Sequence, residues 1–391
     1  MGYGHRQHRG EEVGVTVLAG GRLVGPERVT AGWLRVADGR LTDVGTGPPP
    51  APTADEHSLQ LDGYVLPGFV DLHCHGGGGA TFTTDDPAQA RAAADFHLRH
   101  GTTTMLASLV TAPLATLTGQ AAVLSGLAAD GAIAGVHFEG PFLSAQRCGA
   151  QDPAHLRDPD PGAVEALLDA AAGRAAMITV APELPGALDL VRTAVAAGVV
   201  PAVGHTDATY DQARAAIDAG ATVATHLFNG MRPLHHREPG PILACLSAPQ
   251  VTCELINDGV HLDPRVVRFA AETGTACLVT DAISAAGSSD GTYQLGSLAV
   301  QVADGVARLA DGGSIAGSTL TMDTAVRRAV QDAGLSLVDA ARAASLTPAQ
   351  ALGLADTVGS LEPGKRADLV VLDDALQLTG VMRAGEWAIG P

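Results

Sequence analysis

Short runs of apolar, mostly β-branched residues recur along the chain, and alanine-rich stretches separate most of them. The spacing of apolar residues in these stretches is helical, and Asp86 and Pro87 supply an N-cap and a first-turn proline for one of them. Eight strands that alternate with helices predict an α/β fold, a (β/α)8 TIM-like barrel. The strand-like runs are 65–72, 102–109, 133–138, 177–181, 199–204, 222–226, 251–256 and 276–280, and the helical stretches include 87–100, 161–172, 187–197 and 207–219.

The two ends of the chain follow a different pattern. Residues 13–60 and 362–389 contain short strand-like runs and turns, among them a further strand at 367–373. Neither end is large enough to form a stable sheet alone, so we predict that both ends together build one small β-sandwich domain beside the barrel. The predicted division is a disordered extension (1–12), the first part of the β-domain (13–65), the barrel (66–361) and the second part of the β-domain (362–391).

Composition and charge exclude several classes of protein. The net charge of −18 argues against nucleic-acid binding, which requires a basic face. No apolar run reaches membrane-spanning length, and the polar first twelve residues lack the apolar core of a signal peptide. The five cysteines are odd in number and show no Cys-x-x-Cys spacing, which favours a reducing cytoplasm over a disulfide framework.

Six polar residues of the metal-ligating type follow five of the predicted strands. Any one of them could be a core histidine or a helix cap, which is the commoner role of a lone polar residue. All strands of a (β/α)8 barrel open their carboxyl ends on one face, so six such residues at five strand ends predict a metal site. They are His73 and His75 after the first strand, Glu139 at the third, His205 at the fifth, His226 at the sixth and Asp281 at the eighth.

These residues leave room for one or two divalent ions. Imidazole and carboxylate ligands without thiolate suit Zn, with Fe, Co or Mn as alternatives. His73 and His75 alternate with Cys74, so in a strand both imidazoles point the same way, and the glycines at 76–79 let the backbone turn sharply afterwards. The single lysine, Lys365, lies beyond the barrel and cannot bridge two ions. Glu139 therefore bridges a pair, or the site holds one ion.

The motifs resemble those of the N-acetylglucosamine-6-phosphate deacetylases of the amidohydrolase superfamily. The resemblance extends in order from about Val13 to Gly385. It rests on the segments PGFVDLHCHG, HFEGPF, GHTDA, THLFNGM, REPG, NDGVH, TDA, IAGSTLTM and GSLEPGKRADLVVLD.

The resemblance implies a function and a set of roles. Members of the family remove acetate from the amine of a phosphorylated sugar, usually as homodimers. By resemblance, Glu139, His205 and His226 are metal ligands, His73 and His75 hold a second ion, and Asp281 is the catalytic acid and base. Arg237 and His261 are implied to bind the phosphate. The implied substrate contacts are Ala150, Gln151, Asn229, Gly230, Arg237, Asp258, Gly259, Val260, His261, Ile315, Ala316 and Gly317.

One segment departs from the family pattern. Gln151 stands where the family usually has a histidine that reaches the substrate, and its amide can donate a hydrogen bond but cannot carry charge. We expect weaker polarisation of the substrate carbonyl or a different sugar preference, with His155 as a less favoured substitute. Cys148, on the same loop, is expected to be a passive exposed thiol.

Two rival functions are left open by the sequence. One is a different amidohydrolase reaction, such as deamination or the opening of a cyclic amide, and the same fold could also serve a related N-acyl amino sugar. The other is a sugar-phosphate sensor without catalysis. A sensor would be expected to lose metal ligands or the acid and base, and all of them are present in this chain.

Overall fold

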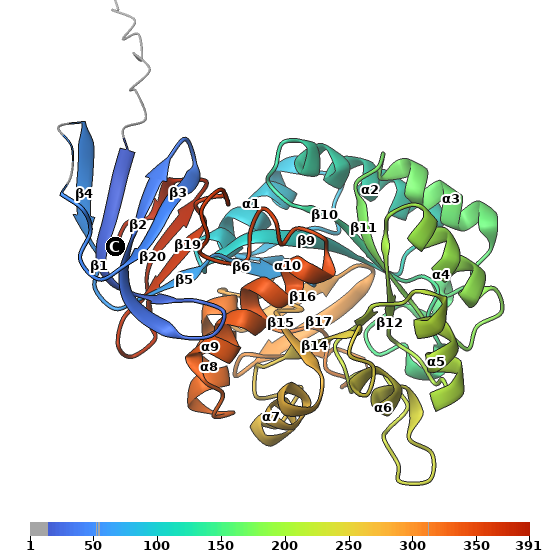
Figure 1. The fold of residues 1–391 in the computed structure, drawn as a ribbon. Coiled ribbons are helices and arrows are strands. Elements are labelled where there is room, and N and C mark those ends of the chain that lie inside the picture. Colours follow the sequence, from blue (N-terminus) through green and yellow to red (C-terminus); the bar gives the residue numbers. More distant parts are fainter. Residues whose placement is uncertain (1–14, 52, 54, 312) are drawn as a thin grey trace, which may run out of the picture.

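The structure is a computed structural model, and it describes residues 15–51, 53, 55–311 and 313–391. The predicted disordered extension at 1–12 lies outside the described residues. Figure 1 shows a barrel of strands and helices with a separate sheet at one side.

The barrel is built from eight parallel strands, as the sequence predicts. Neighbouring strands pair in chain order, and the first and last are joined by a parallel bridge between Cys74 and Ala282. Next to this bridge the Asp281 amide donates a hydrogen bond to the His73 carbonyl at 2.8 Å. The strands are β6 (Phe69–Asp71), β9 (Thr102–Val110), β10 (Gly135–Glu139), β11 (Ala175–Val180), β12 (Val200–Val203), β13 (Val223–Ala224), β14 (Thr252–Ile256) and β15 (Thr275–Val279).

Helices surround this sheet, and their starts follow local sequence rules. Asp86 accepts a hydrogen bond from the Ala88 amide at 2.9 Å, and Pro87 occupies the first turn of the helix that follows. Alanines and leucines on the inner faces of the helices pack against the strands in one continuous apolar core. The helices are α1 (Pro87–Leu98), α2 (Leu114–Ala129), α3 (Pro161–Ala170), α4 (Ala187–Ala196), α5 (Tyr210–Ala219), α6 (Gly240–Leu246), α7 (Pro264–Thr273), α8 (Met322–Gln331), α9 (Leu337–Ala341) and α10 (Thr347–Ala351).

The two chain ends form one sheet, coloured blue and red in Figure 1. β5 from the first end pairs with β19 from the last, with Leu66 opposite Val370. Both ends contribute to one apolar cluster that includes Leu18, Leu34 and Val371. The strands are β1 (Val15–Val24), β2 (Val29–Ala37), β3 (Arg40–Thr46), β4 (Glu56–Gln60), β5 (Tyr64–Pro67), β19 (Leu369–Leu372), β20 (Leu378–Arg383) and β21 (Glu386–Ile389).

The apolar run at 65–72 contains two strands rather than one. The chain leaves the end sheet at Pro67 and enters the barrel at Phe69. A side chain at Gly68 would place a Cβ 2.2 Å from Thr103 Oγ1, so only glycine fits between the two sheets.

A three-stranded antiparallel sheet lies between β15 and α8, where the sequence analysis predicts no strands. Its strands are β16 (Gly291–Leu295), β17 (Leu298–Ala303) and β18 (Val306–Leu309). Leu295 and Val300 pack with Val110 and Ile283 from the barrel, so this sheet is joined to the carboxyl end of the barrel by its own apolar cluster. Among the described residues, no helix has the length and apolar character needed to span a membrane.

Candidate active site

The candidate ligands emerge from the barrel strands at its carboxyl end. Glu139 is the last residue of β10, and His205 and His226 follow β12 and β13 by two residues each. The backbone is left-handed at His205 (φ 45°), His226 (φ 28°) and Asp281 (φ 48°). Such conformations cost about 1–3 kcal/mol each and persist where the surroundings hold them, which is common at functional sites.

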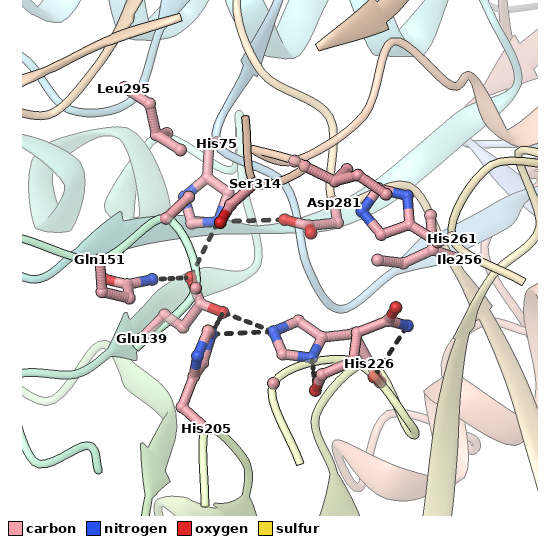
Figure 2. Close-up of a pocket in the computed structure, with 16 residues that line it drawn as sticks. His75, Glu139, Gln151, His205, His226, Ile256, His261, Asp281, Leu295 and Ser314 are labelled. Carbon is pink, nitrogen blue, oxygen red and sulfur yellow. Dashed lines mark hydrogen bonds and ion pairs between the residues drawn. The ribbon is translucent and has the colours of Figure 1, made fainter. Parts of the chain in front are cut away.

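The Glu139 carboxylate lies at the centre of four imidazoles. Its Oε1 is 2.9 Å from His226 Nε2, 3.1 Å from His205 Nε2 and 3.3 Å from His73 Nε2. Its other oxygen, Oε2, is 3.2 Å from His75 Nε2. Figure 2 shows Glu139 between His75 on one side and the pair His205 and His226 on the other. All five side chains are buried.

The hydrogen-bond partners of the four histidines define their tautomers. Each ring has an oxygen acceptor next to its Nδ1, so the proton resides on Nδ1 and the Nε2 lone pair points inward. Four Nε2 lone pairs therefore converge on one carboxylate, an arrangement that suits a cation between them. The acceptors are Glu254 Oε2 for His73 (3.1 Å), the Ser108 carbonyl for His75 (3.1 Å), the Arg147 carbonyl for His205 (2.9 Å) and the Asn229 carbonyl for His226 (3.1 Å).

Electrostatics within the cluster also favour a cation. Burial acts to raise the pKa of Glu139, but the surrounding imidazoles, first of all His73, hold that pKa well below its usual range. Burial acts to lower the pKa of His75, but Asp281 and Glu139 raise it to about 9. The carboxylates thus stabilise positive charge at the imidazole rings. A divalent cation would compete with protons for the Nε2 lone pairs of these rings.

The donor set fits two divalent cations sharing one carboxylate. The ligand atoms of His73, His75 and Glu139 lie within 4.8 Å of one another, and so do those of Glu139, His205 and His226. Nitrogen and carboxylate donors without thiolate match Zn, Fe, Co or Mn. Cys74 faces away from these ligands and lies 3.2 Å from His97, as the alternation of the strand predicts.

Asp281 lies beside two of the candidate ligands and faces the cavity. Its Oδ1 is 3.3 Å from His75 Nε2 and 3.5 Å from His73 Nε2, and its side chain lines the cavity. Burial acts to raise the pKa of Asp281, whereas the neighbouring rings of His73 and His75 lower it below its ordinary value. The carboxylate is therefore ionised near neutral pH and available to accept a proton.

The cavity above the cluster has a volume of about 260 Å³, close to the lower end of ligand pockets, about 300–1,000 Å³. This size suits a single sugar unit. The predicted substrate residues that line the cavity are Ala150, Gln151, Asn229, Gly230, His261, Ile315 and Gly317.

Five predicted contacts lie outside the lining of this cavity. Asp258, Gly259 and Val260 form the turn that presents His261, and Asp258 Oδ2 accepts a hydrogen bond from His261 Nδ1 at 2.7 Å. Ala316 is buried in the apolar cluster beneath the three-stranded sheet. Arg237 is exposed, and its closest polar neighbour is the His236 ring at 2.9 Å. Its implied phosphate contact stays a prediction.

Gln151 lines the cavity and also contacts Glu139, a candidate metal ligand. Its Nε2 donates to Glu139 Oε2 at 2.6 Å, and its Oε1 accepts from the Thr111 amide at 2.7 Å. The side chain is buried, and Figure 2 shows it beside Glu139. The glutamine thus holds Glu139 in place, a contact that the sequence analysis does not predict. His155 lies outside the cavity lining.

Several functional residues escape the sequence analysis. Glu254, in the middle of β14, is fully buried against His73, and the only sequence signal for it is a lone acidic residue within an apolar strand. The other lining residues are equally divided between loops and the last positions of strands β14 and β16. They are Gly149, Ile256, Leu295 and Ser314.

Comparisons with known proteins agree with this geometry. A profile of the amidohydrolase family matches residues 64–388. The chain is 36% identical over 384 residues to an N-acetylgalactosamine-6-phosphate deacetylase of Escherichia coli O157:H7, across 95% of this chain and 99% of that protein. It is 37% identical over 387 residues to the N-acetylglucosamine-6-phosphate deacetylase of Homo sapiens, across 94% of this chain and 90% of that protein.

A solved structure gives the same result. A mutant N-acetyl-D-glucosamine-6-phosphate deacetylase from Mycobacterium smegmatis, in complex with N-acetyl-D-glucosamine-6-phosphate, superposes with a TM-score of 0.92. The two sequences are 48% identical, and the match covers 96% of this chain and 100% of that one. The chain belongs to the amidohydrolase family and, within it, to the N-acetylglucosamine-6-phosphate deacetylases.

Proposed function

We propose that this protein is a metal-dependent hydrolase that removes acetate from N-acetyl-D-glucosamine 6-phosphate and releases D-glucosamine 6-phosphate. The observation that carries the proposal is the convergence of four Nε2 lone pairs on Glu139, with the ionised Asp281 at the edge of the same cavity. Relatives and a structural neighbour that carry this activity by name support the choice of substrate.

The residues of this chain have separate tasks in the reaction. His73 and His75 would hold one divalent cation, His205 and His226 a second, and Glu139 would contact both. A bound divalent cation lowers the pKa of water toward neutrality and polarises a carbonyl oxygen. We propose Zn²⁺ as the ion, with Fe, Co and Mn as the alternatives that elemental analysis would distinguish.

Asp281 would move the proton. Hydrolysis of an amide requires that the attacking water lose a proton and that the amine gain one before it leaves. Asp281 lines the cavity and is ionised, so it can accept the proton from water and deliver it to the nitrogen of the sugar. The acetyl C–N bond then breaks to give the neutral amine and acetic acid, and the acid loses its proton to solvent and is released as acetate.

The remaining lining residues would hold the sugar phosphate. His261 is the candidate for the phosphate within the cavity, with Asp258, Gly259 and Val260 positioning its ring. Asn229, Gly230, Ala150, Gln151, Ile315, Ala316 and Gly317 are the proposed contacts and supports for the sugar, and Arg237 is proposed as a second phosphate ligand. We also propose a homodimer in the cytoplasm, in keeping with five cysteines that are all free.

A substrate panel tests this proposal. Acetate release should be fastest with N-acetyl-D-glucosamine 6-phosphate, slower with its galactosamine epimer, and slowest with unphosphorylated N-acetyl-D-glucosamine. Because one relative is an N-acetylgalactosamine-6-phosphate deacetylase, a preference for the epimer is the second candidate function. Release of ammonia from amino-substituted substrates, or ring opening of a cyclic amide, without any acetate release from the N-acetyl sugars would contradict both.

A further inference from the structure

Glu254 differs from the other acceptors that hold the four histidines. Ser108, Arg147 and Asn229 each offer a neutral backbone carbonyl, whereas His73 receives a side-chain carboxylate. A carboxylate that accepts the second N–H of a ligating imidazole fixes the ring and raises its basicity more than a carbonyl does. The asymmetry therefore singles out His73 among the four rings.

Glu254 also reaches the second pair of histidines. Its Oε2 accepts from His73 Nδ1 at 3.1 Å and from the backbone N–H of His226 at 3.0 Å. One oxygen therefore contacts a residue of each proposed cation site. The contact to His226 is made at a left-handed backbone position, where φ is 28°, so the hydrogen bond also supports a conformation that is unfavourable by itself.

An ordinary ion pair with an arginine or lysine does not explain why Glu254 is buried where it is. The side chain is completely buried, and its Oε1 has no hydrogen-bond partner among the described residues. Across residues 15–51, 53, 55–311 and 313–391, the structure pairs it with His73 and with no arginine or lysine. The contacts of Oε2 to the His73 ring and to the His226 backbone are therefore the interactions that account for a carboxyl group at this buried position.

We propose that Glu254 is a positioning residue for the metal centre: it sets the tautomer, orientation and basicity of His73 and fixes the spacing of His73 and His226. This inference rests on the proposed metal-dependent function. The quantity that Glu254 should change is the affinity for the ion held by His73 and His75, because the Glu254 carboxylate contacts the His73 ring directly.

Metal binding, measured apart from activity, tests the inference. Chelator-treated wild type, E254A, E254Q and L255A are titrated with Zn²⁺ by calorimetry, and bound metal is counted by elemental analysis. The H73A variant is titrated in the same way, and the Zn²⁺-binding step that it lacks is assigned to the ion held by His73. Leu255 is the matched control, because it is equally buried on the same strand and its side chain points to the other face.

We expect E254A to bind the His73 ion about 10–100-fold more weakly than wild type. E254Q should show a smaller loss, of at least about threefold, because its amide oxygen can accept both hydrogen bonds but lacks the charge. L255A should lower the Tm and keep the wild-type affinity. If E254A does not fold, the Zn²⁺ affinity of E254Q alone tests the inference.

Wild-type affinity in E254Q or E254A, or an equal loss in L255A, would overturn the inference. A wild type that deacetylates the sugar phosphate with a single bound ion would also overturn it and leave the proposed function intact. Conversely, a wild type that binds two ions and releases no acetate would contradict the proposed function, while the affinity series would still report on Glu254.

Discussion

Replacement of Asp281 by asparagine isolates proton transfer from binding. The amide keeps the size of the carboxylate but can neither accept the proton of the attacking water nor return it to the amine. Asp281 Oδ1 is 3.3 Å from His75 Nε2 and the side chain lines the cavity, so the variant leaves the ligand set of histidines and Glu139 intact. General acid–base groups contribute about 10²–10⁴-fold, which corresponds to about 3–5 kcal/mol of activation free energy.

We therefore expect D281N to reduce kcat by about two to four orders of magnitude, with a much smaller change in substrate affinity. The assay is steady-state acetate release from N-acetyl-D-glucosamine 6-phosphate, combined with calorimetric binding of the substrate to D281N. D189N is the matched control, because Asp189 lies exposed on α4 and, in the part of the chain that the structure describes, pairs only with Arg192. A D281N enzyme with more than about a tenth of the wild-type kcat would refute the assigned role.

Three further predictions address the ions, the phosphate and pH. Removal of both imidazoles in H73A/H75A should reduce the number of bound divalent ions from two to one in elemental analysis, and equal counts in variant and wild type would refute the two-ion site. R237A should raise KM for the 6-phosphate sugar about ten- to a hundredfold, because a hydrogen bond to a charged group contributes about 1.5–3 kcal/mol. An equal rise in KM for the unphosphorylated sugar would mean that Arg237 has a structural role and does not bind the phosphate. Burial lowers the pKa of His97 to about 4 from about 6.5 in an unfolded chain, so the free energy of unfolding should fall by up to about 3 kcal/mol as the pH drops from 6.5 to 4. H97Q should flatten this dependence in urea unfolding, and an equally steep decline in the variant would contradict the assignment.

The barrel and its ligands follow from the sequence because both depend on short-range regularities. Strand period and helix spacing locate the eight strands, and the barrel topology then brings His73, Glu139 and His226 to one face without any knowledge of loops. The end sheet is likewise predictable, since both flanks contain short strand-like runs that need partners in a sheet.

Loops and inserted elements depend on contacts that no periodicity encodes. The hydrogen bond from Gln151 to Glu139 arises from the path of the loop after β10, and the motif alone suggests a substrate contact instead. The three-stranded sheet does have a local signal, since Gly296-Ser297 and Asp304-Gly305 separate short alternating runs as hairpin turns do. The role of Glu254 requires the distance to His73, which lies 181 residues away in the sequence.

The most direct test of the whole account is the dependence of acetate release on bound metal. Chelated protein is supplied with increasing equivalents of Zn²⁺ while acetate release from N-acetyl-D-glucosamine 6-phosphate is recorded. The account predicts negligible release without metal and a rise that levels off at no more than two equivalents per chain. Undiminished release by the fully chelated protein would contradict it.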